Sequence, residues 1–323
     1  MNIKNISVVM CTYNGADFLK EQLDSIINQT YPIYELIIQD DCSTDTTVSI
    51  LKEYEKKYDY IHVYVNLKQK GINENFYSAM ERATGEFITI SDQDDIWEPD
   101  KIETQINTIG DKWLSCGCSK PFSPTKDLFF DTRIPNPAIE RLIYVNTLAA
   151  GHSMLLNKEM LPFIPKDTFI IYDHIILIVA ASNNMISYNN KILVNHRMHA
   201  KSATYSIPVM KSGGNNKSIS NIVKSLFRTL KLYFKLRNDI HRYFAEVYTL
   251  LKGFPDWNAK NNALEIAKYQ SQKGFLSYIK LTYSCVKSRN HLFYSIEKDS
   301  LLTFFRAIYF PISSSDYFRY MLK

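Results

Sequence analysis

A short apolar run, Ile6-Ser7-Val8-Val9-Met10-Cys11, sets the architecture of this chain, and the polar residues Thr12-Tyr13-Asn14-Gly15 follow it directly. An uninterrupted apolar run of this length predicts a strand that is buried on both faces. Apolar residues at helical spacing come next, over residues 17–28. The change of period from one segment to the next predicts a strand followed by a helix.

The same alternation continues through the first hundred residues. The pattern predicts strands at 35–39, 61–65 and 86–90, helices at 45–58 and about 74–83, and another helix from near Pro99. Gly85 is expected to close the helix over 74–83 as its C′ residue. Repeated strand–helix units predict an α/β fold, a doubly wound and mainly parallel sheet that binds ligands beyond the carboxyl ends of its strands.

The rest of the chain is less regular. Residues 110–137 are rich in Pro, Ser and Lys and are expected to form a loop over a site, whereas 148–157 and 186–199 are expected to be strands or strand–turn units. Helical spacing dominates past residue 205. We therefore predict two domains, an α/β domain over 1–205 and a basic, aromatic-rich helical extension over 206–323.

Composition and charge narrow the class of protein. The 323 residues are 46% hydrophobic and 22% charged, which excludes wholesale disorder. The net charge of +5 divides into −8 over residues 1–200 and +13 over 201–323, where 20 Lys/Arg stand against 7 Asp/Glu. The acidic part suits a metal or a reactive carboxylate, and the basic part suits phosphates or an anionic membrane.

Cysteine spacing and hydropathy bear on the compartment. The five cysteines lack the spacing of a disulfide framework, and the first residues lack a signal-peptide apolar region. The longest apolar run, residues 169–181, is interrupted by Tyr172-Asp173-His174 and is too short to span a membrane. We expect a cytoplasmic protein.

Three polar clusters are predicted to share one edge of the sheet: Thr12–Gly15, Asp40-Asp41-Cys42-Ser43, and Ser91-Asp92-Gln93-Asp94-Asp95. Three carboxylates in the last cluster repel one another, and Mg²⁺ or Mn²⁺ shared with a diphosphate would relieve the repulsion. The alternative is a solvated acidic turn. Either Asp40 or Asp41 could contact a nucleobase or a ribose or assist the metal, while Ser43, Thr44 or Asp45 would otherwise only cap the following helix. Tyr13 suits either stacking on a base or packing.

Several of these segments together resemble the family 2 glycosyltransferases. Residues 9–15 (VMCTYNG), 23–26 (LDSI) and 29–32 (QTYP) resemble the opening of that family, and 37–45 (IIQDDCSTD) resembles its nucleotide-binding DDGSTD segment, with Cys42 in place of Gly. Gly71, Asn75-Phe76, 83–85 (ATG) and 91–97 (SDQDDIW) are similar to the bacterial rhamnosyltransferase-like branch. The resemblance covers about residues 5–204.

The resemblance implies a GT-A-like, mixed and mainly parallel sheet, and it implies roles for particular residues. Asp41 would contact the base and Tyr13 would stack on it, with Thr12, Asn14, Gly71 and Asn75 completing the nucleotide site. Asp92 and Asp94 would be the Asp-x-Asp pair, Asp94 the more direct ligand of Mn²⁺ or Mg²⁺.

Further segments resemble the acceptor side of the family. Residues 151–154 (GHSM) resemble its glycine-led segment, and Asp173 stands where the family's HDWW-like segment places its base. Residues 195–199 (NHRMH) resemble its YRQH segment, which makes Arg197 a phosphate contact and His199 a metal or diphosphate contact. The departures, His174-Ile175 and 200–202 (AKS), fall on residues that recognise sugar and acceptor.

Asp173 is also a candidate base on physical grounds. It interrupts the apolar stretch 169–177, and burial raises the pKa of a carboxyl and improves it as a base. The alternative is a helix cap, and His152 and His174 are rival bases. His199 would otherwise be a structural histidine.

The basic extension alternates aromatic residues with cations, as in Arg242-Tyr243-Phe244 and Phe304-Phe305-Arg306. Such helices suit the inner face of an anionic membrane, or they pack their rings in a core. We find no nucleic-acid recognition motif and expect no nucleic-acid partner.

The sequence predicts a metal-dependent, inverting glycosyltransferase. Its donor would be a nucleoside diphosphate sugar of the dTDP-rhamnose or UDP-hexose type, and its acceptor a hydroxyl of a glycan or lipid-linked glycan in polysaccharide assembly. One rival is a catalytically silent nucleotide-sugar or membrane-binding protein of the same fold. Another is a response-regulator-like phosphoacceptor, against which the chain length and the second acidic cluster argue.

Overall fold

The computed structural model describes residues 3–123, 125, 128, 130, 135–146, 148–199, 219–293 and 301–321. The chain divides into two compact units. The first comprises residues 1–130, 149–180 and 185–206, and the second comprises 131–148, 181–184 and 207–323. The boundary predicted at 205/206 lies outside the described residues and stays a prediction.

The first unit is built on a mixed sheet. Among the described residues its eight strands are β1 (Ile6–Thr12), β2 (Glu35–Asp40), β3 (Ile61–Val65), β4 (Phe87–Ser91), β5 (Ile96–Trp97), β6 (Leu114–Phe122), β7 (Met154–Asn157) and β8 (Ile186–Arg197), in the order 3-2-1-4-7-6-8-5. Strands 3-2-1-4 are parallel, and so is the pair β6 and β8, whereas the other pairs are antiparallel. The predicted doubly wound, mainly parallel sheet is confirmed.

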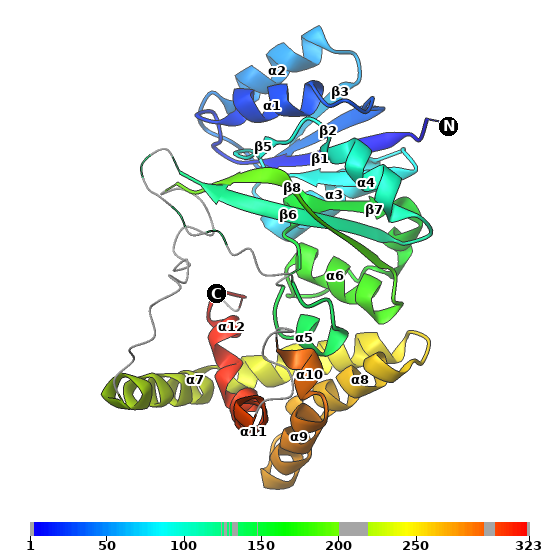
Figure 1. The fold of residues 1–323 in the computed structure, drawn as a ribbon. Helices are drawn as coiled ribbons and strands as arrows, with labels where there is room; N and C mark the ends of the chain where they lie inside the picture. Colours follow the sequence, from blue (N-terminus) through cyan, green and yellow to red (C-terminus); the bar gives the residue numbers. More distant parts are fainter. Residues whose placement is uncertain are drawn as a thin grey trace. The chain divides into compact units, whose positions relative to one another are not determined.

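Helices pack on this sheet because each carries an apolar face. They are α1 (Leu19–Ile27), α2 (Thr47–Lys57), α3 (Ile72–Arg82) and α4 (Lys101–Ile109). The 3-10 turns η1 (Gly151–Ser153) and η2 (Lys158–Phe163) also occur here, as does α6 (Tyr172–Ser182), whose residues 174–182 are all buried. Figure 1 shows α1 and α2 side by side along the sheet. In α1 the buried residues Leu19, Leu23 and Ile26 recur at helical spacing. They meet β1 and β2, which are buried along nearly their whole length.

Two predictions about local structure are wrong. Residues 110–137 are not wholly irregular, because β6 occupies Leu114–Phe122. Gly85 is not a C′ residue in the left-handed region, since α3 ends at Arg82 and Ala83 already has extended angles. The physical reason for Gly85 is close approach: a Cβ there would lie 2.7 Å from the Asn5 carbonyl oxygen and from Ser7 Oγ.

The second unit is helical, as the extension was predicted to be. Its helices are α5 (Ile139–Leu142), α7 (Ile219–Lys252), α8 (Asn258–Gln270), α9 (Phe275–Lys287), α10 (Arg289–Leu292), α11 (Leu301–Ser313) and α12 (Ser315–Met321). Its core is aromatic: Tyr144 packs on Phe244 and Phe310, and Tyr243 packs on Phe318. Other rings of the extension, Phe227 and Phe305 among them, are exposed. None of the helices in the described ranges is both long and apolar enough to cross a membrane.

Candidate active site

The three polar clusters meet at the carboxyl edge of β1, β2 and β4. The amide of Tyr13 donates to Gln93 Oε1 at 2.9 Å, and Gln93 Nε2 donates back to the Tyr13 carbonyl oxygen at 3.1 Å. The amide of Asn14 donates to Ser43 Oγ at 2.9 Å. The loops after three separate strands are therefore joined into one surface.

Asp40 holds the second loop together. Its Oδ2 accepts from Thr12 Oγ1 at 2.8 Å and from Ser43 Oγ at 2.5 Å, and it is fully buried. Cys42 follows at φ +62°, in the left-handed region that favours glycine. Cys42, which replaces the Gly of the family's segment, therefore has a backbone conformation that is strained for a residue with a side chain. Asp40 therefore has a structural role in this loop.

Asp41 is fixed by donors from the turn before α3. Its Oδ1 accepts from Asn66 Nδ2 at 2.9 Å and from the Lys70 amide at 2.7 Å, and its Oδ2 accepts from the Gly71 amide at 3.0 Å. Burial alone would raise the pKa of this carboxyl, but these hydrogen bonds outweigh it and lower the pKa. Asn75 completes the group, because its Oδ1 accepts from the same Asn66 amide at 2.6 Å.

Tyr13 differs from these neighbours in being open to solvent. Its side chain remains 46% exposed, while Asn14 Oδ1 accepts from the Thr44 amide at 2.8 Å. Thr12, Asn14, Asp41, Gly71 and Asn75 therefore form a rigid rim, and Tyr13 is the ring in this group that is free to stack on a ligand.

A histidine lies within hydrogen-bond distance of each carboxylate of the acidic loop between β4 and β5. His152 Nδ1 lies 3.0 Å from Asp92 Oδ2 and 3.1 Å from Asp95 Oδ2. His196 Nδ1 donates to Asp95 Oδ1 at 2.9 Å, and His199 Nε2 donates to Asp94 Oδ2 at 2.7 Å. The repulsion that the sequence predicts in this loop is thus partly compensated by the protein itself.

The pKa values of His152 and Asp95 in this cluster shift in opposite directions. Burial alone lowers the pKa of His152, but the charges of Asp95 and Asp92 raise it to about 9. Burial raises and the two histidines lower the pKa of Asp95, and the net direction is downward. His152 is therefore a cation at neutral pH and donates from its ring nitrogens. Asp95, His152 and His196 each offer one ligand atom within 4.8 Å of the others, so they form a second group that could hold an ion.

Asp94 is the carboxylate left least compensated. Burial raises its pKa, the charges of Asp92 and Asp95 raise it further, and the hydrogen bond from His199 does not reverse the shift. A divalent cation would relieve that cost. The donor set fits one, since carboxylate oxygens suit Mg²⁺ and Mn²⁺ and an imidazole suits Mn²⁺. Asp94, Asp92 and His199 are the residues that would hold it.

Arg197 positions this loop. Its amide donates to Asp95 Oδ1 at 3.0 Å and its Nε donates to the Asp94 carbonyl oxygen at 2.9 Å. The guanidinium pairs with Glu21 and lies over the rings of Phe18 and Phe122, 4.8 and 4.7 Å from their centroids. The predicted phosphate contact is therefore engaged with Glu21 in this arrangement.

Asp173 lies in the first turn of α6 near the acidic loop. Burial and the charge of Asp92 raise its pKa to about 6, against hydrogen bonds from the amides of His174 and Gly151. Gly151 is required there, because a Cβ would lie 2.2 Å from the hydroxyl oxygen of Tyr172. The ring of Tyr172 stacks on Phe76 at 4.1 Å. The rival bases His174 and His152 are both buried as well, and the charges of Asp95 and Asp92 raise the pKa of His152.

Sequence reasoning did not place Gln93, Asp95 and His196 among the site residues. Asp95 was seen only as one of three repelling carboxylates, and its partner His196 is 101 residues away along the chain. The signal present was the pair of histidines, His196 and His199, near the end of the predicted strand 186–199, together with an acidic run that contains no cation.

The comparisons with known proteins follow this geometry. Residues 7–180, which contain the rim, the acidic loop and Asp173, match the family model described as glycosyl transferase family 2. The chain belongs to this family. The predicted family resemblance is thereby confirmed over more than half of the chain.

Relatives among known glycosyltransferases match about a third of this chain. The dTDP-rhamnosyl transferase RfbG of Shigella flexneri is 39% identical over 105 residues, which are 31% of this chain and 36% of RfbG. TuaG of Bacillus subtilis, provisionally named a teichuronic acid biosynthesis glycosyltransferase, is 38% identical over 114 residues, 35% of this chain and 44% of TuaG. This chain thus spans less than half the length of these curated relatives.

Solved structures resemble nearly the whole chain. S. aureus TarS 1–349, crystallised with UDP-GlcNAc, has a TM-score of 0.59 at 16% identity and covers 98% of this chain and 90% of its own. The mannosyltransferase PcManGT of Pyrobaculum calidifontis, crystallised with GDP-Man and Mn²⁺, has a TM-score of 0.50 at 14% identity, with coverage of 98% and 87%. At this identity the likeness shows the fold, and the GT-A-like fold with a C-terminal helical region is confirmed.

Proposed function

We propose that this protein is a metal-dependent, inverting glycosyltransferase. It would move a sugar from a nucleoside diphosphate sugar to a hydroxyl of a glycan or lipid-linked glycan in cell-surface polysaccharide assembly. The observation that carries the proposal is a group of carboxyls with different pKa shifts at one end of the sheet. The pKa of Asp41 is lowered, whereas the pKa values of Asp94 and Asp173 are raised.

The rim around Asp41 supports a nucleotide donor. A carboxylate whose pKa is lowered only accepts hydrogen bonds, so it favours bases that present an imide N–H, as uracil and thymine do. The exposed ring of Tyr13 offers a stacking face beside it. The names of RfbG, a dTDP-rhamnosyl transferase, and of TarS with UDP-GlcNAc agree with such donors.

The acidic loop supports a divalent cation at the diphosphate. Bound there, Mg²⁺ or Mn²⁺ would neutralise the charge that develops on the leaving nucleoside diphosphate. Asp94, Asp92 and His199 would hold it, while Arg197 and Asp95 keep the loop in place. The fold brings Asp92, Asp94 and His199 together but gives Asp94 too few hydrogen bonds to offset its burial.

Asp173 supports direct displacement at the anomeric carbon. A carboxylate with a pKa near 6 is largely ionised at neutral pH and accepts a proton better than an exposed one. In the proposed reaction it removes the acceptor hydroxyl proton while that oxygen forms the new glycosidic bond and the nucleoside diphosphate leaves. A single displacement inverts the anomeric centre, as it does in inverting glycosidases, where one carboxylate acts as the general base.

The replacement Asp173→Asn tests this assignment, because it keeps the shape of the side chain and removes its basicity. We expect release of nucleoside diphosphate in the presence of acceptor to fall by about 10²-fold or more, with nucleotide affinity within about twofold of wild type. Asp167→Asn, on an exposed carboxylate just before α6, is the control and should keep wild-type turnover. Turnover retained by Asp173→Asn would remove Asp173 from the role of base. A wild-type protein that binds nucleotide sugars but never cleaves them would instead be the silent protein of the same fold.

A further inference from the structure

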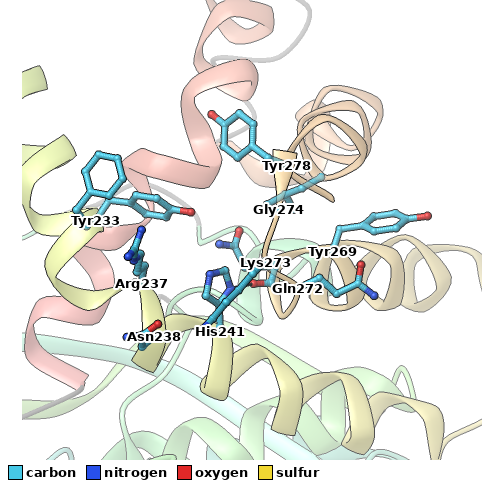
Figure 2. Close-up of a pocket in the computed structure, with 12 residues that line it drawn as sticks. Tyr233, Arg237, Asn238, His241, Tyr269, Gln272, Lys273, Gly274 and Tyr278 are labelled. Carbon is cyan, nitrogen blue, oxygen red and sulfur yellow. Dashed lines mark hydrogen bonds between the residues drawn. The ribbon is translucent and has the colours of Figure 1, made fainter. Parts of the chain in front are cut away.

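A cavity of about 270 Å³ lies wholly within the helical unit, between α7, α8 and the start of α9. Figure 2 shows Arg237 and Tyr233 on one side of it, His241 and Lys273 near the middle, and Tyr278 beyond them. None of the described residues that line it is acidic. A cavity lined by cations and tyrosine hydroxyls, without a carboxylate, favours an anionic group such as a phosphate.

The lining leaves the charges of Arg237 and Lys273 available, and His241 adds an imidazole ring to the wall. Nδ1 of His241 donates to the Gln270 carbonyl oxygen at 2.6 Å, which fixes the ring at the cavity wall. Arg237 and Lys273 are exposed, and within the described part of the chain neither pairs with a carboxylate. Residues 266–296 add to this field, since they contain five Lys or Arg and no Asp or Glu.

The helix that begins at this cavity exposes its apolar side. Four large side chains of α9 face solvent, Phe275 (81% exposed), Leu276 (65%), Ile279 (47%) and Tyr283 (70%), and we call them the α9 stripe. The residues that α9 buries are Leu281, Ser284 and Cys285. Successive residues turn by 100° in a helix, so the α9 stripe occupies about one quadrant, bordered by Lys280 and Lys287.

The cavity and the α9 stripe adjoin, because Gly274 and Tyr278 line the cavity and Phe275 and Ile279 belong to the stripe. An apolar strip edged by lysines beside an anion pocket matches the interface of an anionic bilayer, where the lipid phosphates lie directly outside the acyl chains. A second copy of this chain fits less well, since its own lysines would face these.

We propose that α9 lies in the interface of an anionic phospholipid membrane, with the α9 stripe among the lipid chains and a lipid phosphate in the cationic cavity. This goes beyond the proposed reaction and does not depend on it, since none of these residues belongs to the candidate active site.

Flotation of the full chain with vesicles tests the proposal. We expect binding to vesicles enriched in phosphatidylglycerol, little binding to phosphatidylcholine alone, and weaker binding as salt is raised. The cavity variant Arg237→Gln/Lys273→Gln should lower the partition coefficient by about 30-fold, as two cations at an anionic surface predict. The control Arg228→Gln/Lys252→Gln removes equal charge from exposed positions outside the cavity and should lose less than about threefold.

A second pair of variants isolates the α9 stripe. Phe275→Ser/Leu276→Ser should reduce vesicle binding at least about tenfold, whereas Leu67→Ser, at a fully exposed leucine of the first unit, should not. Thermal melts should show all variants folded. The proposal is overturned by a wild-type chain that does not float with anionic vesicles at low salt, by equal losses in the cavity variant and its control, or by wild-type binding of the stripe variant. A dimer in light scattering that the stripe variant dissociates would also overturn it, since the occupant would then be a second copy.

Discussion

The protonation of Asp173 links its burial to the pH dependence of the reaction. Burial and the charge of Asp92 raise its pKa to about 6, so it is protonated, and unable to act as a base, at lower pH. We expect kcat/KM to fall about tenfold per pH unit below 6 and to level above about pH 7. A pH–rate profile of the wild-type protein checks this. A rate that is flat, or that falls with rising pH across this range, would contradict the assignment of the base.

Some residues of the site could be predicted from the sequence and others could not. Asp92, Asp94 and Asp41 follow directly after buried strands, so the topology of a parallel sheet is enough to place them on one edge. The pairing of Asp95 with His152 and His196 could not be predicted, because no local rule connects residues so far apart along the chain. Because of that pairing the pKa of Asp95 is lowered, whereas the pKa of Asp94 stays raised.

At the scale of elements, Glu35 ties two strands to the turn before a third. This first residue of β2 accepts from Ser7 Oγ at 2.6 Å, from the Thr84 amide at 2.6 Å and from Thr84 Oγ1 at 2.8 Å. Burial alone raises the pKa of Glu35, but the hydrogen bonds lower it overall. The ionised form is thus more favoured in the folded chain than in the unfolded chain.

Replacing Glu35 should therefore change stability in a pH-dependent way. A lowered pKa contributes stability that is present above the unfolded value of about 4.3 and is lost as pH falls through the folded value. We expect Glu35→Gln to lower the free energy of unfolding by about 1–3 kcal/mol at pH 7, and the difference from wild type to shrink below about pH 4. The control Glu86→Gln breaks an exposed pair with Lys4 and should cost under about 1 kcal/mol. Urea unfolding measures both, and equal losses would refute this role of Glu35.

The strand β6 shows why the rest of the fold could not be predicted from local pattern. Its residues Leu114–Phe122 include Gly117 and Pro121 and no β-branched side chain, so propensity favours a loop. They form a strand because β7 and β8 supply partners on both sides, with register shifts near Cys118. By contrast, β1, β2 and β3 satisfy local pattern and topology together, and their predicted bounds agree with the structure to within one residue.

At the scale of the whole molecule, residues 135–146 belong to the core of the helical unit. Nδ2 of Asn136 donates to the carbonyl oxygens of His291 and Phe293, both at 2.7 Å. The guanidinium of Arg141 donates to the Leu292 carbonyl oxygen at 2.6 Å, and Tyr144 is fully buried among rings of α7 and α11. A segment from the middle of the chain is thus packed by helices that follow residue 219.

A fragment of residues 1–205 should therefore be poorly soluble. It would keep Leu142, Ile143 and Tyr144, which are fully buried in the full chain, without the helices that cover them. We expect residues 1–205 to associate or precipitate, and Leu142→Ser/Ile143→Ser to improve the solubility of that fragment while destabilising the full chain. Light scattering and thermal melts measure both effects. A monomeric, cooperatively folding 1–205 fragment would contradict this expectation.

In the proposed function, the edge of the sheet that carries Asp94 holds a divalent cation together with a nucleoside diphosphate. Calorimetric titration of UDP and dTDP, with Mn²⁺ and with chelator, tests it most directly. We expect heat of binding for at least one nucleotide. This heat should require Mn²⁺, should be lost in Asp94→Ala, and should persist in Asp111→Ala, a change at a largely exposed carboxylate. Binding that is unchanged by chelator, or kept in full by Asp94→Ala, would contradict it.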